Sequence, residues 1–528
     1  MTIPTSPRPS IDPPLRSHQP QRIQFLGSPA ARLFSQEVAE SFQGVLTRNM
    51  ITDRRDPNVG FVAASIDGRP WFDTMWTRDA GVFLRELAQW GYLEQAMLLA
   101  EALMGLVRPN SEGFCTFPEY FKIGQPGSGS ELDGTGAIVI GLVLLWQRLP
   151  AGNPTRSKIE AFLQGDPSPI TYILRQLEKA PLIAGSGEFG GGCGIQGEFY
   201  NSVQNNLVYL ALNMTARMLR ARNQVQGAAQ CEQAASLILQ NMLRYLRGAD
   251  GTWTWAIDPT TCQPDPAIIN HPINQGFGGL NAILAMTGDV NGFTLAGFDS
   301  ALVEASRKTF DQLLAFPIRR AAFEKHGIWT QFDRHCHGYL SGPSYGQGYA
   351  AQSMLLMDRM EMAGKAIEGL AEVTYRPFPV NNFDRDSDFF FYERFYLPEL
   401  LEHPETINTV SDQWYDGRRF EQGCGALNLV CVAEPLKMAR LVVGLDDHDP
   451  QHLQLIPRLP TSWSGYEAEN WPVLTPSGLA RVNLHCERQG DSLRLELVQL
   501  EGPRLADIEA RLPSNEGWTW KRIPVKTK

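Results

Sequence analysis

Two opposite charges, Arg78 and Asp79, stand at the start of the largely apolar segment Trp76–Trp90. This segment is typical of a buried helix, and burying charges is unfavourable unless they are paired or used. One interpretation is an intrachain ion pair, with the Asp stabilised by the helix dipole. The nearby Trp71 and Trp76 favour a sugar site instead, because indoles stack on pyranose rings while Arg and Asp hydrogen-bond the hydroxyls.

The elements that must position this pair form a repeat. Apolar segments, three of which open with Gln-Gly-x-Gly or Gly-Gln-Gly at Gln275, Gln347 and Gln422, alternate with longer amphipathic ones. A helix that is apolar on all sides is buried, whereas one with a single apolar stripe exposes its other face to solvent. The predicted inner helices are Trp76–Trp90, Asp133–Trp146, Tyr200–Arg220, Asn274–Met286, Gly346–Met357 and Gln422–Gly444. The predicted outer helices are Ala31–Met50, Tyr92–Arg108, Pro169–Ala180, Gly227–Arg247, Ser300–Phe316 and Arg359–Tyr375.

Six alternating inner and outer helices predict a mainly α fold, an (α/α)6 toroid of six helical hairpins, because each hairpin buries its face only against its neighbours. Glycines at the inner-helix starts would let backbones approach closely. An open α-solenoid is the alternative. Long aromatic- and glycine-rich loops precede the inner helices, and such loops are usually functional. We expect all of them to gather at one end of a closed ring.

Three domains are expected from the changes in pattern. Residues 1–28 form a Pro-rich tail expected to be disordered, and residues 29–446 form the helical domain. After Gly444, the segments HLQLIPRLP, GLARVNLHCE and DSLRLELVQLEG alternate with period two. Residues 447–528 are therefore predicted to form a small C-terminal antiparallel β-sandwich.

Composition excludes several classes of protein. The net charge of −10 argues against nucleic acid as a partner. The longest apolar run, Gly136 to Trp146, is too short for a membrane span, and the N-terminus has no apolar signal region. We therefore expect a cytoplasmic protein with no membrane partner. Eight scattered cysteines make neither a disulfide framework nor a zinc motif, and His335-Cys336-His337 lacks a matching second cluster, so no metal is expected.

The segment WTRD followed by a hydrophobic helix resembles the first active-site motif of the glucoamylase family. The wider pattern PWF-x-TM-W-x-RD also resembles the glycogen-debranching α-glucosidases of the same six-hairpin glycoside hydrolase superfamily. The resemblance extends over roughly residues 67–444 in helix order, with three short specific motifs. It implies that Trp76, Arg78 and Asp79 hold the sugar in the cleaved subsite.

The glycine-rich loop Gly185–Gly192 carries the second motif. It resembles the stretch that supplies the general acid in bacterial glucoamylases, which implies that Glu188 is the proton donor. A donor is needed because an alkoxide leaves poorly unless its oxygen is protonated. The family's Trp before this Glu is Gly187 here, and Glu198 remains an alternative acid.

Ser411–Gly417, SDQWYDG, carries the third motif. Glucoamylases have Ser-Glu-Gln-Tyr-Asp in this place, so the resemblance implies that Asp412 is the general base, with Trp414 beside it as a substrate-binding residue. The other register places the neutral Gln413 there, and Asp412 also fits an N-cap or turn residue. The alternative bases that stay open are Glu393, Asp416 and Glu421.

The resulting hypothesis is a glycoside hydrolase that needs no cofactor and cleaves a terminal, α-linked glucosyl residue with inversion. Asp133 is a further expected substrate-binding residue, and the other candidates for subsite lining are Glu131, Trp329, Phe117, Glu119, Tyr120 and the stretch Asn381–Tyr392. A glycoside phosphorylase would need a basic anion pocket, which the sequence does not reveal. A carbohydrate-binding toroid without a base is the non-enzymatic alternative, and a polysaccharide lyase fits the acidic charge poorly. The exact sugar, the anomer and the oligomeric state stay open.

Overall fold

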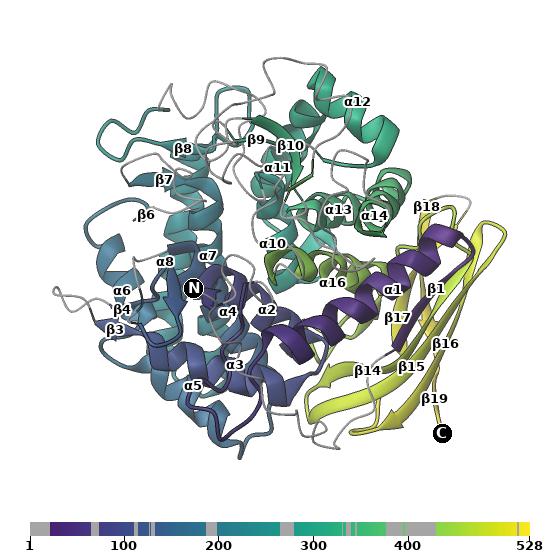
Figure 1. The fold of residues 1–528 in the computed structure, drawn as a ribbon, viewed down its shortest axis with the longest axis horizontal. Helices are drawn as coiled ribbons and strands as arrows, with labels where there is room; N and C mark the ends of the chain where they lie inside the picture. The colour runs from purple at the N-terminus through teal and green to yellow at the C-terminus, as the bar shows by residue number, and fades with distance from the viewer. Residues whose placement is uncertain are drawn as a thin grey trace, which may run out of the picture.

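The computed structural model describes residues 22–64, 73–109, 115–125, 127, 132–185, 198–264, 279–329, 331–333, 339–343, 346–375, 394–395, 429–514 and 517–528. The chain is mainly helical and the longer strands gather near the C-terminus, as the sequence predicts; in the fold these strands lie beside α1 (Figure 1).

Six helices of the described ranges are buried along most of their length. They are α2 (Thr77–Gln89), α4 (Leu132–Arg148), α7 (Ser202–Ala221), α10 (Asn281–Asn291), α13 (Gln347–Leu356) and α16 (Leu429–Val443). Each packs against the next in this order, and α16 packs back against α2, so the helices close a ring. They correspond to the predicted inner helices, although α10 begins at Asn281 rather than Asn274.

Contacts between the first two turns join four pairs of neighbouring inner helices. A Cβ added at Gly81 would lie 2.8 Å from a backbone nitrogen of α4, and one at Gly136 would lie 2.9 Å from a side chain of α7. Gly348 in α13 has no room for a Cβ because α16 passes directly over it. Asn206 Nδ2 of α7 donates to Ile283 O of α10 at 3.2 Å. The close approach predicted for glycines at the inner-helix starts is confirmed, and in these four pairs the helices begin at the same end of the ring.

The other helices lie outside this ring and bury one stripe each. They are α1 (Pro29–Gly44), α3 (Leu93–Leu106), α5 (Pro154–Gln164), α6 (Pro169–Leu177), α8 (Val225–Asn241), α11 (Ser300–Leu314), α12 (Pro317–His326) and α14 (Met360–Tyr375). The π-helical turns η1 (Val45–Asn49) and η2 (Met242–Leu246) extend α1 and α8, and the 3-10 turn η3 (Leu295–Gly297) precedes α11. The sequence prediction missed α5 and α12, although both begin with a proline at the first turn, and Asn153 caps α5 by accepting from Thr155 N at 2.9 Å.

Short strands lie in the segments between the helices. They are β2 (Thr74–Trp76), β3 (Arg108–Pro109), β4 (Cys115–Thr116), β5 (Tyr120–Lys122), β6 (Ala184–Gly185), β7 (Phe199–Asn201), β8 (Ala256–Ile257), β9 (Gln331–Asp333), β10 (Tyr339–Pro343) and β11 (Arg394–Phe395). Three of their pairings matter for the site: β2 pairs with β5, and β7 pairs with both β6 and β8.

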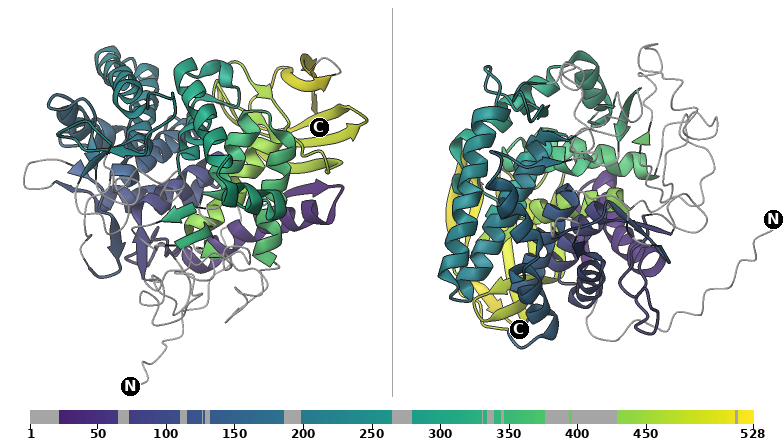
Figure 2. Two further views of the ribbon diagram at one scale, coloured as in Figure 1. Left: turned by 90° about the horizontal axis from the view of Figure 1, so that it is seen from above. Right: turned by 90° about the vertical axis from the view of Figure 1, so that its left-hand side faces the viewer.

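The C-terminal region contains two sheets, which touch where β16 meets β17 and β18. Their strands are β1 (Arg22–Leu26), β12 (Leu445–Asp446), β13 (Gln454–Leu455), β14 (Gly465–Thr475), β15 (Gly478–Gln489), β16 (Ser492–Glu501), β17 (Ile508–Ser514), β18 (Gly517–Ile523) and β19 (Val525–Thr527). The sheet orders are β1-β14-β15-β16-β19 and β12-β13-β17-β18. These strands stay together beside the helices in both views of Figure 2.

Two details of the predicted organisation are wrong. Residues 22–26 were assigned to the disordered tail, but they form β1 and pair with β14 from Arg22↔Glu469 to Leu26↔Gly465. Phe25 on this strand is fully buried, which gives the short segment a reason to be ordered. The sheets are also not wholly antiparallel, because β13 pairs with β17 and β16 pairs with β19 in parallel.

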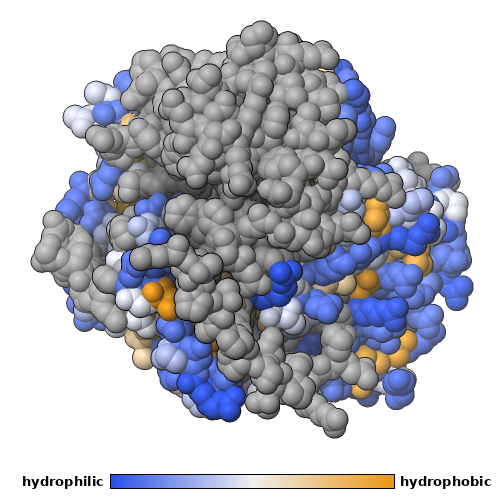
Figure 3. All heavy atoms as spheres, viewed as in Figure 1, coloured by the Kyte–Doolittle hydropathy of each residue, from blue (hydrophilic) through white to orange (hydrophobic). Residues whose placement is uncertain are grey.

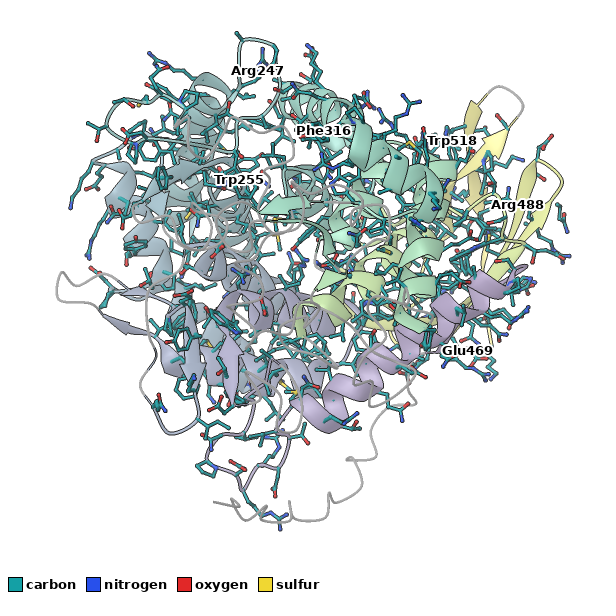
Figure 4. All side chains as sticks on the ribbon, turned by 45° about the horizontal axis from the view of Figure 1, so that its top comes forward. Arg247, Trp255, Phe316, Glu469, Arg488 and Trp518 are labelled. Atoms are coloured by element: carbon teal, nitrogen blue, oxygen red, sulfur yellow. The ribbon has the colours of Figure 1, made fainter. Side chains whose placement is uncertain are left out.

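Polar contacts join the sheets to the ring. Arg148 at the end of α4 contacts Asp447 at 3.0 Å, and Arg481 of β15 donates to Gly91 O at 3.3 Å. Within the sheet region, Arg488, labelled in Figure 4, donates to the backbone oxygens of Leu459 and Trp463 at 3.0 Å. The face of these strands seen in Figure 3 is mostly hydrophilic. Within the described ranges, no helix combines the length and the apolar character that crossing a bilayer requires.

Candidate active site

The first turn of α2 is held against the segment that contains β5. Thr77 is fully buried; its Oγ1 donates to Pro118 O at 2.5 Å and its backbone N–H donates to Glu119 O at 3.1 Å. The β2–β5 pairing sets Trp76 opposite Tyr120, and their ring centroids are 5.1 Å apart at an interplanar angle of 57°. Both residues are partly exposed, so they form an aromatic surface beside the start of α2.

Three charged side chains meet at the starts of α2 and α4. Arg78 Nε lies 3.4 Å from Asp79 Oδ1, and Arg78 Nη1 lies 3.7 Å from Asp133 Oδ2. Their side chains are 5%, 7% and 0% exposed, respectively. Asp133 Oδ1 also accepts from Gly134 N at 2.8 Å. The sequence predictions for Arg78, Asp79 and Asp133 therefore converge on one buried cluster next to Trp76.

The interior of the ring is crossed by a deeper polar network. Arg440 of α16 binds both carboxylate oxygens of Glu86 at 2.8 and 2.9 Å, and it donates to Asp289 Oδ1 of α10 at 2.8 Å. Arg85 Nη1 lies 3.0 Å from the other oxygen of Asp289. Since α10 neighbours neither α2 nor α16 in the ring, these contacts run across its interior.

The charges of this network are matched. Burial alone would lower the pKa of Arg440, but Glu86 and Asp289 raise it overall. Burial alone would raise the pKa of Asp289, but Arg85 and Arg440 lower it overall. Pairing therefore favours the charged forms of Arg440 and Asp289 in spite of their burial.

A second buried pair lies closer to the helix starts. Lys437 Nζ is 2.6 Å from Glu434 Oε1 and 3.7 Å from the centroid of the Tyr349 ring, and both charged side chains are fully buried. Glu434 also accepts a hydrogen bond from the Gly348 backbone N–H in the first turn of α13. Burial raises the pKa of Glu434, whereas Glu434 raises the pKa of Lys437 against the effect of burial.

The start of α7 is polar as well as buried. Asn201 caps the helix by accepting from Val203 N at 2.8 Å and Gln204 N at 3.1 Å. Ser202 N and its hydroxyl both donate to the carbonyl oxygen of Trp255, which is labelled in Figure 4. Asn205 makes three further hydrogen bonds, so this turn connects the chain on both sides of the preceding loop.

Several predicted residues lie outside the described residues. They are Glu188, Asp412 and Trp414, together with the alternatives Gln413, Glu393, Asp416 and Glu421, and the candidates Glu131 and Asn381–Tyr392. Glu198, the alternative acid, is described and is exposed directly before β7.

Two expected subsite residues belong to the core instead. Phe117 is fully buried and packs on Phe162, with ring centroids 6.0 Å apart. Trp329 is 2% exposed and packs on Phe310 at 5.1 Å, with Arg319 over its ring at 4.9 Å. Both rings are therefore packed against other side chains of the core.

The sequence prediction described the inner helices as almost uniformly apolar and missed the networks around Arg440 and Lys437. Charged residues inside otherwise apolar helices were the available signal, because such charges must find partners when buried. Among the described residues, no group of three or more His, Cys, Asp or Glu side chains is arranged to hold a metal ion.

No protein-family model and no curated protein matches this chain. Solved structures do share its fold. An α-L-rhamnosidase from Dictyoglumus thermophilum has a TM-score of 0.55 at 10% identity, covering 96% of this chain and 49% of the rhamnosidase. A GH78 family rhamnosidase from Bacillus sp. GL1 has a TM-score of 0.51 at 11% identity, covering 97% and 43%. A structure described as a wild-type glycosidase reaches 0.48 at 16% identity, covering 78% and 97%.

This chain thus spans about half the length of the two rhamnosidase chains that it resembles. At these identities the likeness is one of fold, and it extends over both the helical ring and the C-terminal sheets.

Proposed function

We propose that this chain is a glycoside hydrolase that removes a terminal sugar, on an (α/α)6 toroid of six helical hairpins. The observation that carries the proposal is the buried Arg78–Asp79–Asp133 cluster beside the Trp76–Tyr120 surface, at the end of the ring where the inner helices begin. Charged groups that hydrogen-bond hydroxyls, next to aromatic faces, suit a pyranose ring. In this scheme residues 29–446 form the catalytic domain and 447–528 the sheet domain, with β1 added from the N-terminal side.

The residues of the cluster differ in what they offer a sugar. Arg78 supplies N–H donors, and the carboxylates of Asp79 and Asp133 supply acceptors. Asp133 is the more deeply buried carboxylate and lies nearer the guanidinium end of Arg78, so it orients Arg78 as well. The formal charge of the cluster, one Arg and two Asp, is −1, which would favour the positive charge that develops on the sugar ring in an oxocarbenium-like transition state.

For the chemistry itself we keep the acid and base implied by the resemblance to glucoamylases. Glu188 protonates the leaving oxygen, and Asp412 deprotonates a water that attacks from the opposite face, with Trp414 lining the sugar. The loops of Glu188 and Asp412 precede α7 and α16, which stand opposite each other in the ring order. That arrangement supports an inverting pair, whose carboxyl groups are usually about 6.5–9.5 Å apart to leave room for the water. A terminal α-linked glucosyl unit is the substrate we propose.

The first test is turnover of a panel of α- and β-linked disaccharides with and without phosphate. Hydrolysis of an α-glucoside, with release of the inverted anomer by NMR, is the expected result. Phosphate-dependent turnover would establish a phosphorylase, a retained anomer would exclude the inverting pair, and binding without turnover would establish a carbohydrate-binding protein.

The second test is the variant Asp79→Asn. If Asp79 binds sugar in the transition state, kcat/KM should fall by about 100-fold, or about 3 kcal/mol, at an unchanged fold. Asp299→Asn is the matched control, because Asp299 also sits at a helix start and accepts from Ala301 N at 2.9 Å as a cap on α11. Near-wild-type kcat/KM in Asp79→Asn would show that the Arg78–Asp79 pair is structural.

A further inference from the structure

Asn205 joins the two ends of the loop that precedes α7. Its Oδ1 accepts from Ile183 N at 2.9 Å, and its Nδ2 donates to Ile183 O at 3.1 Å and to Asn201 O at 2.9 Å. One amide therefore satisfies both backbone groups of the residue that enters the loop and the carbonyl of the residue that leaves it. Asn205, Asn201 and Ile183 are all buried, so water does not compete for these bonds.

The short ladder beside Asn205 continues the same connection. Ala184 pairs with Tyr200 and Gly185 with Phe199, so the two strands that flank residues 186–198 in the sequence, β6 and β7, form a pair of stems. β7 is in turn paired with β8, and its last residue caps α7. The stems are thus fixed both to the start of the inner helix α7 and to the segment that contains β8.

The same device occurs at α13. Gln347 accepts from Trp329 N at 2.9 Å and donates to Trp329 O at 2.7 Å, and both residues are buried. In both places an amide in the first turns of an inner helix binds the N–H and the C=O of a residue early in the preceding loop. A contact that recurs at two inner helices is a feature of how the ring holds its loops.

We propose that Asn205 is a positioning residue for the general acid, because it fixes the separation and the register of the stems that carry Glu188 and Glu198. This inference rests on the proposed function. The acid must reach the leaving oxygen within hydrogen-bond distance, and loosening both stems would displace it even though Asn205 contacts no substrate.

The test compares Asn205→Ala with Asn206→Ala. Asn206 is equally buried in the same turn, but its amide donates to Ile283 O of α10 rather than to the loop, so it controls for the loss of a buried amide. Each variant is assayed on two glucosides, one with a basic sugar leaving group and one with an activated aryl leaving group. Only the basic leaving group depends strongly on protonation.

Asn205→Ala should lose about tenfold more kcat/KM on the basic leaving group than on the activated one, whereas Asn206→Ala should lose the same factor on both. Equal losses in Asn205→Ala, or the same leaving-group dependence in Asn206→Ala, would overturn the positioning role.

Amide hydrogen exchange gives a second readout that needs no substrate. The Ile183 N–H should exchange about tenfold faster or more in Asn205→Ala and at the wild-type rate in Asn206→Ala, because only the first variant removes its acceptor. Unchanged exchange at Ile183 would show that the Asn205 amide does not hold the Ile183 backbone. If the wild-type protein turns over no glycoside while exchange at Ile183 changes as expected, the proposed function fails but the anchoring of the stems stands.

Discussion

Replacement of Arg440 by methionine should destabilise the ring strongly. Arg440 holds Glu86 and Asp289 through three hydrogen bonds of 2.8–2.9 Å and also donates to Gln89 Oε1 at 2.8 Å. Removing one partner from a buried ion network leaves uncompensated charge and costs about 3–5 kcal/mol. Methionine fills much of the volume of the lost side chain, so the loss of stability reports the missing charge rather than a cavity.

The expected shift in Tm follows from the size of the chain. With 528 residues and an unfolding entropy of about 2.1 cal/mol/K per residue, cooperative unfolding has an entropy of about 1.1 kcal/mol/K. A loss of about 3–5 kcal/mol then lowers the Tm by about 3–5 °C, which differential scanning calorimetry resolves readily.

Two further variants make this prediction refutable. Arg220 pairs with Glu232 through two short contacts, but the side chains are 52% and 41% exposed, so Arg220→Met should leave the Tm unchanged. Adding Glu86→Gln to Arg440→Met should recover part of the lost stability, because it removes the charge of the carboxylate that has lost Arg440. Asp289 still has Arg85 as a partner. A Tm for Arg440→Met that matches Arg220→Met, or no recovery in the double variant, would refute the view that charge pairing holds the interior together.

Two other predictions concern stability. Gly348→Ala should cost about 1–3 kcal/mol of stability because the added Cβ would meet Glu434. Gly105→Ala on the outer helix α3, with nothing within 4 Å of the added Cβ, should stabilise the protein by up to about 1 kcal/mol. Urea denaturation measures both changes, and a Gly348→Ala protein as stable as wild type would contradict the close packing. Burial raises the pKa of Glu37 to about 8, so the folded state keeps a proton that the unfolded state loses above pH 4.5. The free energy of unfolding should therefore fall between pH 4.5 and 8, by at most about 1.4 kcal/mol per pH unit. Glu37→Gln, which keeps an acceptor for the Thr374 hydroxyl, should therefore have a higher Tm than wild type at pH 8 and the same Tm near pH 4; equal values at both pH values would show that Glu37 is not protonated in the fold.

Much of the fold can be predicted from the sequence because burial constrains the composition of each segment. An inner helix of this ring is surrounded by protein, so a segment such as Asp133–Trp146 must be apolar nearly all round, and its glycines appear where a neighbour comes close. The same reasoning identified the pair Arg78–Asp79 as two charges in a segment that should have none. Each of these signals lies within one segment of the chain and needs no partner to be recognised.

The partners of buried charges were decided by the tertiary structure alone. Arg440 binds Glu86 across 354 positions of sequence, and Arg22–Leu26 joins a sheet whose next strand begins at Gly465. No local pattern specifies such a pairing, because any buried carboxylate could satisfy any buried guanidinium and any strand edge could accept another strand. The choice among them depends on which groups the closing of the ring brings within hydrogen-bond distance, where the low dielectric of the interior makes a correct partner strongly favourable and a missing one costly.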